Sequence, residues 1–514
     1  MKKTIIFLFT AILFLIPSGA YATNLSISNV TVTKISGGTA DVTFDIDWDV
    51  SWRDSTNYDA VWIFLKYSTD SGATWEHGTL YSSGTTPSGY STGSGTGVEI
   101  EVASDQMGAF VQRSSTGSGS TSVDDVTLRW YYGADSVSGT QTVEMSVYGI
   151  EMVYVPQGSF WLGDADGDQT GCFRRQDDTT LPVNVDATMS YVLICANTSN
   201  DDTTLESTGI CIDGDGGLYE ANGSTLINAD YPTGYKAFYC MKYEISQGQY
   251  RDFLNKLTAA EQAIVTDALS SLEYMNNSTT LSNRNGVMCV DGSASPRVYV
   301  CNFDEDTNYN EENDGAELAC NYVSWADLTA YADWSGLRPM TELEFEKACR
   351  GTASAVDDEY VWGSTTINDC TNVLNDGYPD AITNTSSQNC NYNNDYYFGP
   401  VRCGIFAAGA STREEAGASY YGIMEMGGNV YERPVTLGNS TGRNFTGEHG
   451  NGELSSGYAD VTMWPGSAAT GSGLRGGSWL YGSYLARVSD RASAASTLSY
   501  RYGHGGGRLV RSAE

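Results

Sequence analysis

The 514-residue sequence is poor in basic side chains. It holds 28 lysines and arginines against 63 aspartates and glutamates, which gives a formal net charge of -35 at pH 7. Proteins that bind nucleic acid or anionic membrane surfaces need basic patches, so the composition argues against both kinds of partner. Charged residues make up only 18% of the chain and hydrophobic residues 40%. The sequence therefore predicts an acidic globular protein rather than a disordered acidic tail.

Apolar runs long enough to span a bilayer are also missing. The longest run, residues 5–16, is too short for a transmembrane helix. It follows two lysines and precedes Ala20-Tyr21-Ala22, a small-x-small cleavage pattern. This arrangement is typical of a secretory signal peptide over residues 1–22, cleaved after Ala22. We expect a secreted or cell-surface protein with no membrane insertion.

Cysteine does not occur beyond Cys403, although the chain has eleven cysteines. In an exported protein this number predicts disulfides. Because it is odd, at least one cysteine is unpaired or bonded to another molecule. The spacing does not determine the connectivity.

Residues 23–148 are expected to form an all-β immunoglobulin-like sandwich. Period-two alternation with intervening turn residues predicts antiparallel strands at residues 30–33, 40–46, 60–67 and 126–131. Residues 82–97 and 114–122 are rich in glycine, serine and threonine, which favours long flexible loops. No residue pattern here indicates chemistry, so we expect a spacer or docking module.

The C-terminal stretch, residues 474–511, differs from the rest of the chain. It opens with Leu474-Arg475-Gly476-Gly477-Ser478-Trp479 and closes with Gly507-Arg508-Leu509-Val510-Arg511. Glycines beside bulky apolar residues predict a tight framework in which Trp479, Leu509 and Val510 are buried. The middle is built of tyrosine and small residues with no helical or strand period. This composition is typical of an antibody-like paratope.

The middle of this stretch also omits a specific set of residues. From Leu480 to Gly506 there is no lysine, glutamate, glutamine, methionine or tryptophan. A codon ending in C, with its first two bases free, cannot encode any of these five residues. Randomised adenines in codons such as AAC would produce this omission. The simpler interpretation is a surface loop rich in glycine, serine and tyrosine.

The two ends of the stretch resemble the C-terminal end of formylglycine-generating-enzyme-type (sulfatase-modifying factor) domains, a variant of the C-type lectin fold. The resemblance extends from about Met152 to Arg511. Within that superfamily the chain is most similar to the variable proteins of diversity-generating retroelements. In these, a reverse transcriptase copies a template with adenine errors into the end of the gene. The resemblance implies an α+β fold, with the lectin-type domain at residues 149–514 after the sandwich.

Three helices are expected to build the core of this domain. They are predicted at residues 244–254, 324–334 and 338–348, the first after a serine cap. In the third, Thr341 and Glu344 have the spacing of a capping box.

Two acidic insertions interrupt the domain, at about residues 164–231 and 274–318. They contain Asp164-Ala165-Asp166-Gly167-Asp168, Asp213-Gly214-Asp215-Gly216 and Asp304-Glu305-Asp306. Alternate aspartates can surround Ca²⁺, but neither insertion has a bidentate glutamate at the twelfth position, and Arg175 stands there in the first. Solvated loops are therefore the favoured interpretation.

The glycine-rich segment 422–433 resembles the stretch that binds a structural Ca²⁺ in the family. The resemblance places side-chain ligands at Glu425 and Glu432 and backbone carbonyl ligands at Gly428 and Val430. All four offer the hard oxygen atoms that Ca²⁺ prefers. The family usually has an amide at the position of Glu425.

The enzymatic activity of the family needs residues that this chain lacks. Formylglycine-generating oxidases bind copper through two cysteines shortly after the Arg-Gly-Gly-Ser motif, because Cu(I) prefers thiolates. The corresponding positions here fall near Tyr481 and Leu485. The three histidines, His77, His449 and His504, are too dispersed for an iron site, and no nucleophilic triad motif is recognisable. We therefore expect no catalysis.

The favoured interpretation is a non-catalytic ligand-binding protein with a diversified surface that recognises a protein or cell-surface ligand. The alternatives are a fixed adhesin or structural surface protein and, less favoured, a carbohydrate-binding lectin or a formylglycine-generating oxidase. The surface is predicted to comprise Leu480, Tyr481, Tyr484, Leu485, Ala492, Ser493, Ala495, Ser499, Tyr500, Tyr502 and His504.

Overall fold

The computed structural model describes residues 25–166, 171–175, 181–189, 191–195, 210–213, 223–385, 387–393 and 396–514. The predicted signal peptide, Asp168 and the Gly214-Asp215-Gly216 part of the second acidic motif lie outside these residues. Within the described part of the chain, no helix is both long and apolar enough to cross a membrane.

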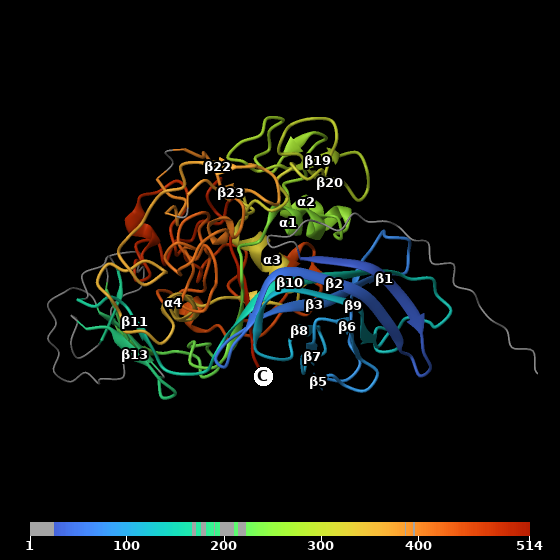
Figure 1. The fold of residues 1–514 in the computed structure, drawn as a ribbon, viewed down its shortest axis with the longest axis horizontal. Helices are drawn as coiled ribbons and strands as arrows, with labels where there is room; N and C mark the ends of the chain where they lie inside the picture. Colours follow the sequence, from blue (N-terminus) through green and yellow to red (C-terminus); the bar gives the residue numbers. More distant parts are fainter. Residues whose placement is uncertain are drawn as a thin grey trace, which may run out of the picture.

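The N-terminal strands form two antiparallel layers (Figure 1). One layer is a four-stranded sheet with the order β1 (Ser26–Lys34), β2 (Ala40–Arg53), β9 (Gly117–Trp130) and β6 (Ser91–Gly95). The other is part of a nine-stranded sheet with the order β21-β26-β17-β10-β3-β8-β7-β5, in which β4 also pairs with β3. Its strands are β3 (Asp59–Ser68), β4 (Glu76–Gly78), β5 (Gly84–Thr85), β7 (Val98–Val102), β8 (Ala109–Arg113), β10 (Glu144–Val155), β17 (Phe238–Met241), β21 (Arg338–Pro339) and β26 (Leu509–Ser512).

Strand β3 is buried on both faces. Val61 and Ile63 face the core between the two layers, whereas Trp62 and Phe64 belong to the core of the larger C-terminal part. Alternating residues of a strand point to opposite faces, so β3 serves two cores at once. β10 continues this connection, because it pairs with β3 from Glu144 to Val153 and with β17 from Met152 to Val155. β10 thus spans the predicted boundary at residues 148/149.

The expected strands in the N-terminal region are confirmed by β1, β2, β3 and β9, but the expected flexible loops are not. Residues 82–97 contain β5 and β6, and residues 114–122 contain the start of β9. β6 pairs with β9 through Ser94↔Asp124 and Gly95↔Val123. Backbone ladder hydrogen bonds here outweigh the low strand propensity of glycine and serine.

The three expected helices are confirmed. They are α1 (Gln247–Leu254), α3 (Trp325–Trp334) and α4 (Glu342–Arg350), and each begins after a serine or threonine that completes a capping box. A further helix, α2 (Ala259–Val265), has the same type of cap, and α5 (Ser440–Arg443) is a single turn.

The insertions contain small strands as well as loops. β11 (Phe160–Leu162) lies just before the first insertion and pairs with β13 (Val183–Val185) inside it. The same insertion holds a sheet of β12 (Phe173–Arg175), β15 (Ile210–Asp213), β14 (Tyr191–Cys195) and β16 (Gly223–Leu226). In the second are β18 (Glu273–Tyr274), β19 (Val287–Asp291) and β20 (Val298–Cys301). Asp304 and Asp306 are exposed in the loop that follows β20.

Long irregular segments dominate the chain after α4. They contain β22 (Val373–Leu374) with β23 (Ile382–Thr383), β24 (Leu454–Ser455) with β25 (Tyr458–Ala459), and two 3-10 turns at Ile405–Ala407 and Ser483–Ala486. The C-terminal stretch returns from these loops to the central sheet as β26, between β17 and β21.

Candidate functional site at the C-terminal stretch

The stretch begins in a buried framework. Arg475 is enclosed in the protein and forms ion pairs with Glu342 (3.0 Å) and Glu346 (2.7 Å) of α4. Gly476 follows with φ +81°, and a Cβ atom there would lie 2.5 Å from the carbonyl oxygen of Met426. Only glycine fits this left-handed, crowded position.

The stretch ends in a second buried framework. Arg508 donates to Oε1 of Glu432 (2.5 Å) and to the carbonyl oxygen of Met424 (2.7 Å). Leu509 and Val510 are fully buried in β26, and Trp479 is buried at the other end of the stretch. The expected burial of these three apolar residues is confirmed.

Between the two frameworks, the backbone is irregular but fixed. The Trp479 indole donates to the carbonyl oxygen of Gly503 (2.9 Å), and Arg433 donates to that of Leu498 (2.9 Å). Backbone N–H groups of Asn393 and Tyr431 donate to the carbonyl oxygens of Tyr481 and His504. The buried Trp479 and groups outside the stretch therefore set the course of its main chain.

A row of aromatic rings connects the two halves of the stretch. Ring centroids lie 5.6 Å apart for Tyr500 and Tyr502, 4.3 Å for Tyr502 and His504, and 5.2 Å for His504 and Tyr481. Tyr431, which sequence reasoning did not include, joins the row 5.8 Å from Tyr481. Tyr431 and Tyr481 are distant in sequence from Tyr500, Tyr502 and His504. The fold places all five rings in one row.

Exposure divides the predicted surface residues into three groups. Tyr500, Tyr484 and Tyr481 are exposed by 60%, 54% and 39%, and Ser499 is exposed too. Leu480, Ala492, Ser493 and His504 are half-buried. Burial and the charge of Arg433 lower the pKa of His504 to about 4, so its ring is neutral at pH 7.

Three of the predicted surface residues are instead buried: Leu485, Ala495 and Tyr502. Leu485 and Tyr502 pack with Tyr431 and Leu474 in a small apolar cluster, and the Arg433 guanidinium lies 5.0 Å from the centroid of the Tyr502 ring. Ala495 is buried two residues after Ser493, whose carbonyl oxygen accepts a hydrogen bond from the Leu474 N–H (3.0 Å). Only the remaining residues can contact a partner directly.

Exposed aromatic residues from another loop lie close to the stretch. Tyr396 and Phe398 follow Asn393, whose backbone contacts Tyr481. The side chain of Asn283 donates to the carbonyl oxygen of Phe398 (3.2 Å). Residues 389–398 are rich in asparagine and aromatic side chains, a sequence signal that could have pointed to this loop.

The glycine-rich segment places its two predicted side-chain metal ligands in the interior. Oε2 of Glu425 accepts from the Gly404 N–H (2.9 Å), while Oε1 is buried without a hydrogen-bond partner. Oε2 of Glu432 is likewise buried without a partner, whereas Oε1 binds Arg508. Burial, with a smaller contribution from Glu432, raises the pKa of Glu425 to about 7. Each carboxylate thus keeps one oxygen that fits a monodentate cation ligand.

The cysteines form no paired site in the part of the chain that the structure describes. Nine of the eleven have described side chains, and all nine are buried and free, so the expected disulfides are not formed among them. Burial raises the pKa of Cys240 and Cys301 to about 12, which keeps both thiols protonated. The apolar core accommodates them as small hydrophobic side chains.

The larger, C-terminal part of the chain matches a known protein family. Residues 197–513 match the sulfatase-modifying factor enzyme 1-like domain. The match covers more than half of the chain, so the protein belongs to this family. The mostly β architecture with few helices is consistent with a C-type-lectin-like fold. No curated protein matches the chain.

Proposed function

We propose that this chain is a non-catalytic, exported ligand-binding protein that displays a diversified C-terminal surface on a C-type lectin fold, preceded by an immunoglobulin-like sandwich. The row of rings from Tyr500 to Tyr481 carries this proposal, because it links the exposed Tyr500 of one half of the stretch to the exposed Tyr481 of the other, through the buried Tyr502 and the half-buried His504. Tyrosine offers a large contact area with few rotatable bonds, and binding hot spots are enriched in it.

The framework supports exchange of the exposed side chains. The main chain is fixed by Trp479, Arg433 and the backbone N–H of Tyr431, so the conformation of the stretch depends little on Tyr484 or Tyr500. Substitutions at exposed positions usually change stability by less than about 0.5 kcal/mol. A surface of this kind can vary while the fold persists.

Retroelement diversification makes a genomic prediction that separates the proposal from a fixed adhesin or structural surface protein. The gene should lie beside a reverse-transcriptase gene and a near-copy of its terminal coding segment. The two copies should differ almost only at adenines of the template. If related genes vary equally along their whole length and no such copy exists, the fixed-surface alternative replaces the proposal.

The partner is proposed to be a protein or cell-surface ligand. Purified chain would be screened against an array of cell-surface proteins, together with a triple variant, Tyr481→Ala/Tyr484→Ala/Tyr500→Ala. Each substitution should weaken binding by about 1–3 kcal/mol. A matched control is Tyr378→Ala/Tyr420→Ala/Tyr458→Ala, which removes three similarly exposed tyrosines elsewhere. Equal binding by wild type and the first variant would contradict the proposal.

Formylglycine-generating activity is the less favoured alternative. The positions of the copper-binding thiols in the family's oxidases fall near Tyr481 and Leu485, and neither residue can supply a thiolate. Incubation of copper-loaded protein with a cysteine-containing sulfatase peptide should give no aldehyde. Detection of the aldehyde product by mass spectrometry would restore the enzymatic interpretation.

We also propose that a structural Ca²⁺ binds at Glu425 and Glu432, with the carbonyl groups of Gly428 and Val430. The support is the unpartnered, buried oxygen atom on each carboxylate. A ligand that binds only the folded state raises its stability. Calcium should therefore raise the melting temperature of wild type more than that of Glu432→Gln. Comparing the two shifts separates lost metal from the weakened Arg508 pair, and equal shifts would contradict the site.

A further inference from the structure

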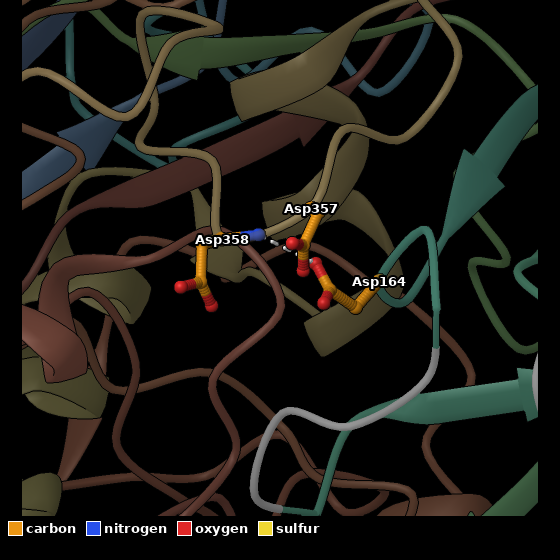
Figure 2. A group of neighbouring side chains, drawn as sticks. All are labelled: Asp164, Asp357 and Asp358. Atoms are coloured by element: carbon orange, nitrogen blue, oxygen red, sulfur yellow. Dashed lines mark hydrogen bonds between the residues drawn. The ribbon is translucent and has the colours of Figure 1, made fainter.

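A separate acidic cluster contacts the C-terminal stretch at Arg487 and Ser489. Asp164 follows β11, whereas Asp357 and Asp358 lie on the loop after α4. One carboxylate oxygen of each lies within 4.8 Å of the others. Figure 2 shows Asp164 and Asp357 turned toward one another, with Asp358 beside them.

Asp164 is the member that the protein leaves unsatisfied. Its side chain is fully buried. Oδ1 accepts from the Asp358 N–H (3.3 Å) and from the hydroxyl of Ser489 (3.2 Å), but Oδ2 has no hydrogen-bond partner. A buried carboxylate oxygen without a partner is strongly destabilising unless it is protonated or bound to a cation.

The charge of the cluster is only partly balanced. Arg487 pairs with Asp358 at 2.6 Å. The cluster holds three carboxylates, more than this one ion pair neutralises, and a divalent cation would supply further positive charge.

We propose that Asp164, Asp357 and Asp358 bind a Ca²⁺ ion. An all-carboxylate set of hard oxygen atoms suits Ca²⁺, and the exposure of Asp357 lets water complete a coordination shell of about 6–8 oxygen atoms. This site differs from the alternating-aspartate loop suggested by the sequence, because two of its members come from a loop that follows α4. It is also distinct from Glu425 and Glu432.

The ion would stabilise the part of the C-terminal stretch around Arg487 and Ser489. Ser489 and Arg487 of that stretch contact Asp164 and Asp358, and the Val488 N–H donates to the carbonyl oxygen of Glu359 (3.0 Å). Calcium at this position would link the Asp164 loop, the loop after α4 and the C-terminal stretch. The site does not depend on which ligand the aromatic surface recognises.

Calorimetric titration of chelator-treated, full-length protein with CaCl₂ tests the proposal. Asp357→Asn changes an exposed side chain and should leave folding intact, yet weaken one Ca²⁺ site at least about tenfold, since ligand charge sets calcium affinity. Asp164→Asn should affect the same site. Asp230→Asn, a substitution of an exposed aspartate elsewhere, should change nothing.

Glu432→Gln should retain calcium binding at Asp164, Asp357 and Asp358. This control distinguishes loss of the aspartate site from failure of the other proposed site, at Glu425 and Glu432. Calcium should also slow amide hydrogen exchange at residues 163–166 and 487–490 in wild type but not in Asp357→Asn. Wild-type stoichiometry and affinity in both aspartate variants would overturn the proposal, as would exchange rates at these residues that do not respond to calcium.

Discussion

At the scale of the residue, burial separates chemically identical side chains in the C-terminal stretch. Tyr500 and Tyr502 are two residues apart and their rings touch, but Tyr500 is exposed and Tyr502 packs against Leu485 and Leu474. Removal of a buried aromatic ring leaves a cavity, whereas an exposed ring is replaced by water. The two tyrosines should therefore serve stability and binding, respectively.

Tyr502→Ala should lower the free energy of unfolding by about 3 kcal/mol because it empties the small cluster around Leu485. Tyr500→Ala should change it by less than about 0.5 kcal/mol. Urea denaturation of both variants measures the difference. Equal effects would show that the two rings share one environment.

Glu317 provides a residue-scale prediction about pH. Burial raises its pKa to about 7, above the value of 4.5 for an unperturbed glutamate, in spite of the nearby Arg402 and Arg251. Between these pH values the folded state holds a proton that the unfolded state has released. The resulting stability is fully present below about pH 4.5 and is lost as the pH rises through 7.

Glu317→Gln removes this titration. Relative to wild type, the variant should gain on the order of 3 kcal/mol of stability between pH 5 and pH 8. Denaturation curves at both pH values give the change, and Glu312→Gln, at an exposed position, is the control. A constant difference between variant and wild type would contradict a raised pKa.

At the scale of the element, helices α2 and α4 each begin with a capping box, but the two boxes lie in different surroundings. Thr258 and Glu261 cap α2, and Thr341 and Glu344 cap α4. Glu344 also forms a buried, bidentate ion pair with Arg338, at 2.7 and 2.9 Å. The cap of α4 thus anchors the helix to β21, whereas the cap of α2 is a local feature.

Glu261→Ala should lower the free energy of unfolding by about 1 kcal/mol, the usual contribution of a cap. Glu344→Ala should lower it by about 3–5 kcal/mol, because Arg338 then remains buried without its carboxylate. Thermal denaturation of the pair measures the contrast. A small effect at Glu344 would mean that Ser512, which also accepts from Arg338, compensates fully.

At the scale of the whole molecule, the long sheet joins the N-terminal strands to the family domain. The Trp62 indole donates to the carbonyl oxygen of Ser335 (2.9 Å), and Lys66 donates to that of Gly452 (2.6 Å). Both residues lie on β3, whose other face belongs to the core between the two N-terminal layers. Neither part keeps a complete core without the other.

The full chain should therefore unfold in one cooperative thermal transition. A fragment of residues 149–514 loses the pairing of β10 with β3 and the packing of Trp62, so it should fail to fold and should bind ANS. Calorimetry and ANS fluorescence test both expectations. A fragment with a sharp transition at the wild-type temperature would show that the two parts are independent.

The sequence by itself determined features that short-range pattern controls. The capping box of Thr341 and Glu344 and the alternation in β2 were readable because caps and strand faces depend on neighbours within a few residues. The burial of Trp479 and Leu509 followed from large apolar side chains beside crowded glycines.

Only the tertiary structure decided which surfaces meet. It turned Tyr502 inward against Leu485 while Tyr500 remained outside, and it paired the glycine- and serine-rich β6 with β9. It also brought Asp164 to Asp358, 194 residues further along the chain. Spacing specifies the period and the caps of an element. Burial and charge balance depend on what packs against that element, and a single sequence does not encode such long-range pairings as a local pattern.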